Sequence, residues 1–74
     1  MKPFPHKSLA RFSRNLRRQR RRMGFTQERL AEKLDIFPRH YQKLEAATVT
    51  PTFGVLLRVK RVLKAGWDDL FGGL

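Results

Sequence analysis

Helix-breaking residues divide this sequence into short segments, each of which has one apolar face. Gly24, Pro38, Pro51 and Gly66 recur along the chain, and glycine and proline are typical of the ends and starts of helices. Between them, apolar residues recur three and four positions apart, and no segment alternates strictly as a strand does. Short one-sided helices are stable only when packed on neighbours, so the sequence predicts an all-α fold, a compact five-helix bundle.

Capping signals place the first two helices. Ser8 is a plausible N-cap for a helix over residues 8–23, which Gly24 would end because glycine suits the position after a helix. Thr26 is the expected N-cap of a second helix, which would end near Leu34.

The remaining helices follow from proline, threonine and glycine. Pro38 suits the first position of a helix, so a third helix is expected over residues 38–46. Thr52 would start a fourth helix, which Gly66 would end. Residues 67–74 are expected to form a short fifth helix or turn.

One apolar stripe on each helix is expected to face the core. These residues share helical spacing within their segments: Leu9, Phe12, Leu16, Leu30, Ala31, Leu34, Tyr41, Leu44, Phe53, Val55, Leu56, Leu57, Val59, Val62, Leu63, Trp67, Leu70 and Phe71. Ile36 would plug the core from the turn between the second and third helices.

Positive charge is concentrated at the N-terminal end. The 74-residue chain carries a net charge of +11, with nine Lys and Arg and no acid in residues 1–22. Residues 23–74 hold eight basic residues against six acids, a net of +2. A strong local positive field favours polyanions such as DNA, RNA or an anionic membrane surface, although a solvated basic face that aids solubility is the plainer interpretation.

Composition argues against several classes of protein. The chain has no cysteine and two histidines far apart, so we expect no disulfide, no metal site and no cofactor. No apolar run is long enough to span a membrane. No nucleophile–base pair stands out, and we expect no enzyme activity. An Arg-rich, acid-free N-terminus also occurs in mitochondrial transit peptides, but the fold needs the first helix.

Four motifs together resemble a known family. "GFTQERLAEKLDI", "YQKLEAA", "TPTFGVLLRVKRVL" and "WDDLF" follow one another without a gap in the pattern. Over residues 16–71 the chain is similar to the Cro/phage-repressor, or xenobiotic-response-element, type of helix-turn-helix protein. The resemblance implies a lambda-repressor-like DNA-binding domain over residues 8–74, preceded by a flexible basic arm over residues 1–7.

The resemblance also implies which residues read DNA. In this family the third helix enters the major groove, where long polar side chains reach base edges. Arginine suits guanine, and glutamine suits adenine. The residues at the base-reading positions are Pro38, Arg39, His40, Gln42 and Lys43.

A second set would hold the DNA backbone. By resemblance, the start of the second helix, the start of the third and the loop after it lie near phosphates, and the arm adds backbone or minor-groove contacts. The residues are Arg20, Thr26, Gln27, Phe37, Thr48, Thr50, Lys2 and Lys7. Arg20 also matches the family arginine that pairs with the glutamate matched here by Glu45, so a structural ion pair is expected.

The sequence departs from the family pattern at several positions. Phe37 replaces a serine and cannot cap the third helix, and its ring could pack on a sugar, on a thymine methyl group or inward. Asp35 and Ala47 stand where glycine is usual; aspartate tolerates a left-handed conformation better than most residues. Gln19 and Lys60 replace apolar residues and could extend toward solvent.

These patterns predict a sequence-specific regulator of transcription, a repressor that binds double-stranded DNA. The family implies a cytoplasmic, bacterial or phage-encoded homodimer, with residues 67–74 as its dimer surface. Two alternatives remain. The chain could be an antitoxin that binds a partner toxin as well as its own operator, or "RRQRRR" could drive nonspecific nucleic-acid binding.

Overall fold

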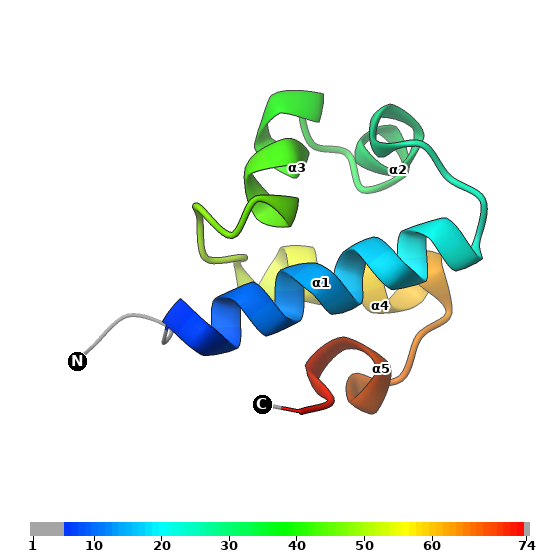
Figure 1. The fold of residues 1–74 in the computed structure, drawn as a ribbon. Coiled ribbons are helices and arrows are strands. Elements are labelled where there is room, and N and C mark those ends of the chain that lie inside the picture. Colours follow the sequence, from blue (N-terminus) through cyan, green and yellow to red (C-terminus); the bar gives the residue numbers. More distant parts are fainter. Residues whose placement is uncertain (1–5, 74) are drawn as a thin grey trace.

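The computed structural model describes residues 6–73, which form five α-helices (Figure 1). The predicted all-α bundle is therefore confirmed. The helices are α1 (His6–Arg22), α2 (Gln27–Lys33), α3 (Pro38–Glu45), α4 (Phe53–Leu63) and α5 (Trp67–Phe71). None of them is long and apolar enough to cross a membrane.

The long helix α1 organises the bundle. In Figure 1 it runs across the middle of the molecule, with α2 and α3 on one side, α5 on the other and α4 behind. Helix α1 contacts α3 and α5, and α2 contacts α3. The core between them consists of one cluster of buried residues: Phe12, Leu16, Leu30, Ala31, Leu34, Tyr41, Leu44, Val55, Val59, Leu63, Ala65 and Leu70.

Two threonines begin helices as predicted. The Thr26 hydroxyl accepts a hydrogen bond from the backbone N–H of Arg29 at 3.0 Å, and the Thr52 hydroxyl accepts one from Val55 at 3.2 Å. Each bond satisfies an N–H group that the first turn of a helix leaves without a backbone partner. Pro38 occupies the start of α3, also as predicted.

The start of α1 differs from the prediction. The helix begins at His6, so Ser8 lies inside the first turn rather than at the N-cap, and Lys7 belongs to the helix. Leu9 is buried, so packing holds the turn that carries it and no serine cap is needed. Lys2 and the other residues of the expected arm before His6 lie outside the described residues.

Helix α4 buries a narrower face than predicted. Val55, Val59 and Leu63 are buried, whereas Phe53 is 69% exposed and Leu57 is 40% exposed. The prediction that Phe53 and Leu57 face the core was therefore wrong. Residues two positions apart on a helix point to nearly opposite sides, so the stripe that contacts the bundle excludes its neighbours.

The connection between α4 and α5 also differs. Helix α4 ends at Leu63, and Lys64 adopts the left-handed conformation (φ 51°), so Gly66 does not end the helix. Gly66 instead precedes α5, where its N–H donates to Asp69 Oδ2 at 2.8 Å. Trp67 stacks on Phe71 but stays 41% exposed.

Gln19 also differs from the prediction that its side chain could extend toward solvent. Its side chain is buried and does not extend to solvent, because its Oε1 accepts a hydrogen bond from Arg22 Nε at 2.7 Å. A buried amide is tolerated when it is hydrogen-bonded in this way. Lys60 is half-buried, and its Nζ lies 5.6 Å from the centre of the Trp67 ring.

Candidate nucleic-acid interface

A tight turn joins α2 to α3. Asp35 adopts the left-handed conformation (φ 57°) that was expected of the residue replacing glycine. The N–H of Ile36 donates to the carbonyl oxygen of Ala31 at 3.1 Å, which closes the turn. Ala31 is fully buried, and its small side chain lets the two helices approach closely. The turn therefore fixes the direction in which α3 leaves α2.

The inner face of α3 is locked to the bundle. Tyr41 and Leu44 are buried, as predicted, and the Tyr41 hydroxyl donates a hydrogen bond to Glu45 Oε2. On α1, the Ser13 hydroxyl donates to the carbonyl oxygen of Leu44 at 2.6 Å. These contacts leave the opposite face of α3 to solvent.

Glu45 connects three parts of the chain. Its Oε2 lies 2.6 Å from Arg20 Nε, and its Oε1 accepts hydrogen bonds from Arg20 Nη2 at 3.2 Å and Gln27 Nε2 at 3.0 Å. Arg20 Nη1 also donates to the carbonyl oxygen of Phe25 at 2.9 Å. Arg17 Nε lies 3.5 Å from Glu45 Oε1. The network joins α1, the start of α2 and α3 around one buried carboxylate.

The network shifts the pKa values of its members. Burial acts to raise the pKa of Glu45, but hydrogen bonds from Arg20, Tyr41 and Gln27 outweigh it and hold that pKa below 4.5. The hydrogen bond to Glu45 raises the pKa of Arg20 above its ordinary value. Burial, followed by the hydrogen bond to Glu45, raises the pKa of Tyr41 far above its ordinary value. At neutral pH the carboxylate and guanidinium are charged and the phenol is neutral.

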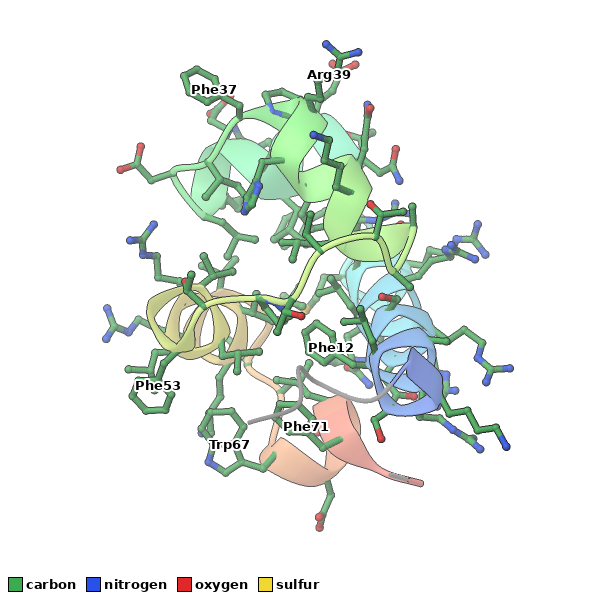
Figure 2. All side chains as sticks on the ribbon, turned by 90° about the vertical axis from the view of Figure 1, so that its left-hand side faces the viewer. Phe12, Phe37, Arg39, Phe53, Trp67 and Phe71 are labelled. Carbon is green, nitrogen blue, oxygen red and sulfur yellow. The ribbon has the colours of Figure 1, made fainter. Side chains whose placement is uncertain are left out.

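The outer face of α3 presents long polar side chains. Arg39, Gln42 and Lys43 are exposed, and their spacing puts them on one side of the helix. Pro38 is exposed beside them, while His40 is half-buried. In Figure 2, Arg39 projects from the end of the molecule formed by α3. Four of the five predicted base-reading residues thus lie on an accessible surface, and His40 does so in part.

The predicted phosphate-binding residues differ in how accessible they are. Thr48 and Thr50 are exposed in the loop after α3, and the Thr48 hydroxyl donates to the carbonyl oxygen of Lys43 at 3.2 Å. The Thr26 hydroxyl is occupied as the cap of α2. Arg20 is buried and Gln27 is half-buried, and both donate to Glu45. Arg20 and Gln27 are therefore placed to hold α3 rather than to reach outward.

Phe37 lies at the start of α3 with its ring in solvent. The side chain is 82% exposed, which excludes the inward packing considered from the sequence. It makes no capping hydrogen bond, and the following residue, Pro38, has no N–H. A hollow beside the ring is lined by Glu32, Asp35, Ile36 and Phe37 itself.

Sequence reasoning missed part of the support beneath α3. Arg17 Nη2 donates to the backbone carbonyl oxygen of Glu45 at 3.2 Å, and Ser13 binds the preceding carbonyl. The signal was present in the spacing, because Ser13, Arg17 and Arg20 are three and four positions apart and so share one side of α1.

The exposed side of α1 is strongly basic. Several arginines of α1 are exposed: Arg11, Arg14, Arg18, Arg21 and Arg22. Within the described residues, no group of three or more histidine, aspartate or glutamate side chains is placed to hold a metal ion.

Comparison with protein-family models matches residues 11–70 to a family described as a helix-turn-helix domain. The match runs from α1 to α5 and so includes the turn at Asp35 and the whole of α3. Comparisons with curated proteins and with solved structures gave no significant match.

Proposed function

The chain belongs to the helix-turn-helix domain family, and from this premise we propose that it is a sequence-specific regulator of transcription that reads duplex DNA with α3. The observation that carries the proposal is the two-sided character of α3. Its inner face is locked to α1 through Glu45, while Arg39, Gln42 and Lys43 face solvent together. A rigidly held helix with an exposed polar face suits direct readout in the major groove.

Base contacts need a register, which backbone contacts supply. We propose that phosphates lie near Thr48 and Thr50 after α3 and near the backbone at Thr26 and Gln27, whose side chains are already hydrogen-bonded within the protein. In this arrangement Arg20 orients α3 through Glu45 and contributes its positive charge to the field at the interface. Lys7 and the exposed arginines of α1 add to the same field, which steers DNA toward the protein.

A homodimer is the proposed binding unit, because one recognition helix reads only a few base pairs. Two copies would read half-sites one helical turn, roughly 34 Å, apart. The dimer surface expected from the sequence was residues 67–74, but Leu70 within it is fully buried. Trp67 of that segment is exposed, however, and we extend the proposed surface to exposed Phe53 and Leu57 of α4; Figure 2 shows Phe53 and Trp67 on the same flank.

The charges around this flank suit contact with a second copy. Lys60 and Arg61 line a hollow next to Leu57 on α4, while Asp68 and Asp69 are exposed on α5. A two-fold axis brings the same surface of both copies together, so acids of one copy can meet bases of the other. This pairing offsets locally the repulsion expected between two chains of net charge +11.

We further propose that the dimer acts as a repressor in the cytoplasm of a bacterium or of a phage-infected cell, by occupying a site that the transcription machinery needs. The exposed arginines of α1 favour one competing function, nonspecific binding of nucleic acid. A toxin partner would need a surface of its own, and the flank with Phe53 and Trp67 is the candidate for it.

Selection from a pool of random duplex DNA at roughly 150 mM salt, followed by sequencing, tests the proposal. Enrichment of an inverted repeat is the expected result, because each half-site would be read by one α3. Binding that persists at low salt without any enriched sequence would instead support the nonspecific function. Co-purification of a protein partner at equal stoichiometry would bring forward the antitoxin alternative.

A further inference from the structure

Phe37 has no structural role that explains its position. It is the most exposed large apolar side chain among the described residues. It also occupies the N-cap of α3, where serine, threonine, aspartate or asparagine would stabilise the helix by accepting a hydrogen bond from a backbone N–H group. The chain therefore gives up both burial of an aromatic ring and a helix cap at the same residue.

The ring lies at the same end of the molecule as Arg39 on the polar face of α3. Phe37 precedes Arg39 by two residues, and Figure 2 shows both side chains projecting from the same end of the molecule, away from the core around Phe12. A DNA duplex seated on Arg39 would therefore also lie against Phe37. The apolar feature that the major groove offers to such a side chain is the C5 methyl group of thymine.

The charges around the ring argue against the backbone as its neighbour. Glu32 and Asp35 line the hollow beside Phe37, and Asp35 is exposed. Glu32 is paired with Arg29, but the Asp35 carboxylate would repel a phosphate, whereas Ile36 and the Phe37 ring offer apolar walls to a methyl group. The same charges disfavour the phosphate contact that the sequence suggested for this position.

We propose that Phe37 is a specificity-determining residue that packs against the C5 methyl group of a thymine next to the bases read from Arg39. The inference rests on the proposed DNA-binding function and names one chemical feature of the site. Phe37 then selects thymine by its methyl group, with no hydrogen bond to the base.

The test replaces thymine by deoxyuridine, one position at a time, in the duplex obtained by selection. Deoxyuridine keeps the base pair and its hydrogen-bonding groups but lacks the C5 methyl group. At one thymine in each half-site the wild-type protein should lose about fourfold in affinity, the amount expected for one buried methyl group. Phe37→Ser should bind the thymine and deoxyuridine duplexes equally.

Phe53→Ser is the matched control, because it removes another exposed phenylalanine, which lies on α4 away from the end of the molecule that carries Phe37 and Arg39. This variant should keep the fourfold thymine preference even if it binds more weakly overall. A thymine preference that is unchanged in Phe37→Ser, or that is absent from the wild type, would overturn the inference and leave DNA binding intact. Failure of every duplex to bind would overturn the proposed function together with the inference.

Discussion

Arg20 on α1 and Glu45 on α3 form a buried, two-pronged ion pair, with 2.6 Å from Nε to Oε2 and 3.2 Å from Nη2 to Oε1. The pair fixes the helix that carries the candidate base-reading residues against the longest helix of the bundle. Its contribution is best seen by removing one partner, because that leaves a buried charge without compensation.

Glu45→Gln should lower the free energy of unfolding by about 3 kcal/mol at neutral pH, since Arg20 would keep a buried charge without its counterion. Urea denaturation followed by circular dichroism measures the change. Glu32→Gln is the matched control, because Glu32 pairs with Arg29 on the surface, where such pairs contribute little. Equal effects of the two substitutions would contradict the importance of burial.

The same pair predicts a pH dependence. The pKa of Glu45 is lower in the folded protein than its ordinary value of 4.5. The carboxylate therefore stabilises the folded state in full at any pH well above 4.5. It is lost as the pH falls through the lower, folded pKa, because the proton binds the unfolded chain first. Between about pH 6 and pH 3, the free energy of unfolding should fall more steeply in the wild type than in Glu45→Gln. Parallel profiles would contradict this.

Arg39→Ala should relax the preference at one base position, at a cost of about 1–3 kcal/mol for the preferred duplex. Arg18→Ala removes an exposed arginine of α1 and should weaken all duplexes equally or have no effect. Repeating the selection with each variant distinguishes the two. An unchanged preferred site in Arg39→Ala would show that Arg39 does not read a base.

Ala47→Gly should stabilise the protein by about 1 kcal/mol, because Ala47 is held in the left-handed conformation (φ 60°) that glycine adopts without strain. Asp35→Gly should stabilise it less, since aspartate tolerates this conformation better than alanine does. Thermal and urea unfolding measure both changes. Ala46→Gly is the control next in sequence: Ala46 has a right-handed conformation (φ −83°), so glycine there should destabilise.

Phe53→Ser should weaken dimerisation, because it removes an aromatic side chain from the flank proposed as the dimer surface. An increase of roughly tenfold or more in the dimer dissociation constant is expected for an aromatic anchor of an interface. Sedimentation equilibrium over a range of protein concentrations measures it, and Phe37→Ser should dimerise as the wild type does. Unaltered dimerisation of Phe53→Ser would place the interface elsewhere.

Phe37→Ser should raise the free energy of unfolding by about 1 kcal/mol, because serine at the N-cap can accept a hydrogen bond from the first turn of α3. The gain in stability should accompany the loss of thymine discrimination, which separates a functional residue from a structural one. A loss of stability on this substitution would mean that the ring supports the fold.

The predicted fold was largely correct because its signals are local. Thr26, Thr52 and Pro38 act on the residues beside them, so they set where helices begin once packing makes those helices stable. The start of α1 was misplaced because Leu9 packs into the bundle and extends the helix before Ser8. Packing of this kind depends on residues distant in sequence.

The position of the candidate site could be predicted from the sequence, but the contacts among its residues could not. The family resemblance identified α3 and the partners Arg20 and Glu45. It did not show that Gln27 and Arg17 also bind Glu45, because the network depends on three helices meeting at one point.

By itself, the sequence determined the helical class of this protein, the order of its helices and the polar composition of α3, because periodicity and capping are properties of neighbouring residues. Only the tertiary structure decided which apolar residues are covered. Phe12 and Phe53 look alike in the sequence, yet Phe12 is buried between helices while Phe53 and Phe37 remain in solvent. Burial depends on what the other helices place against a side chain, and the two surfaces proposed for binding consist of residues that no helix covers.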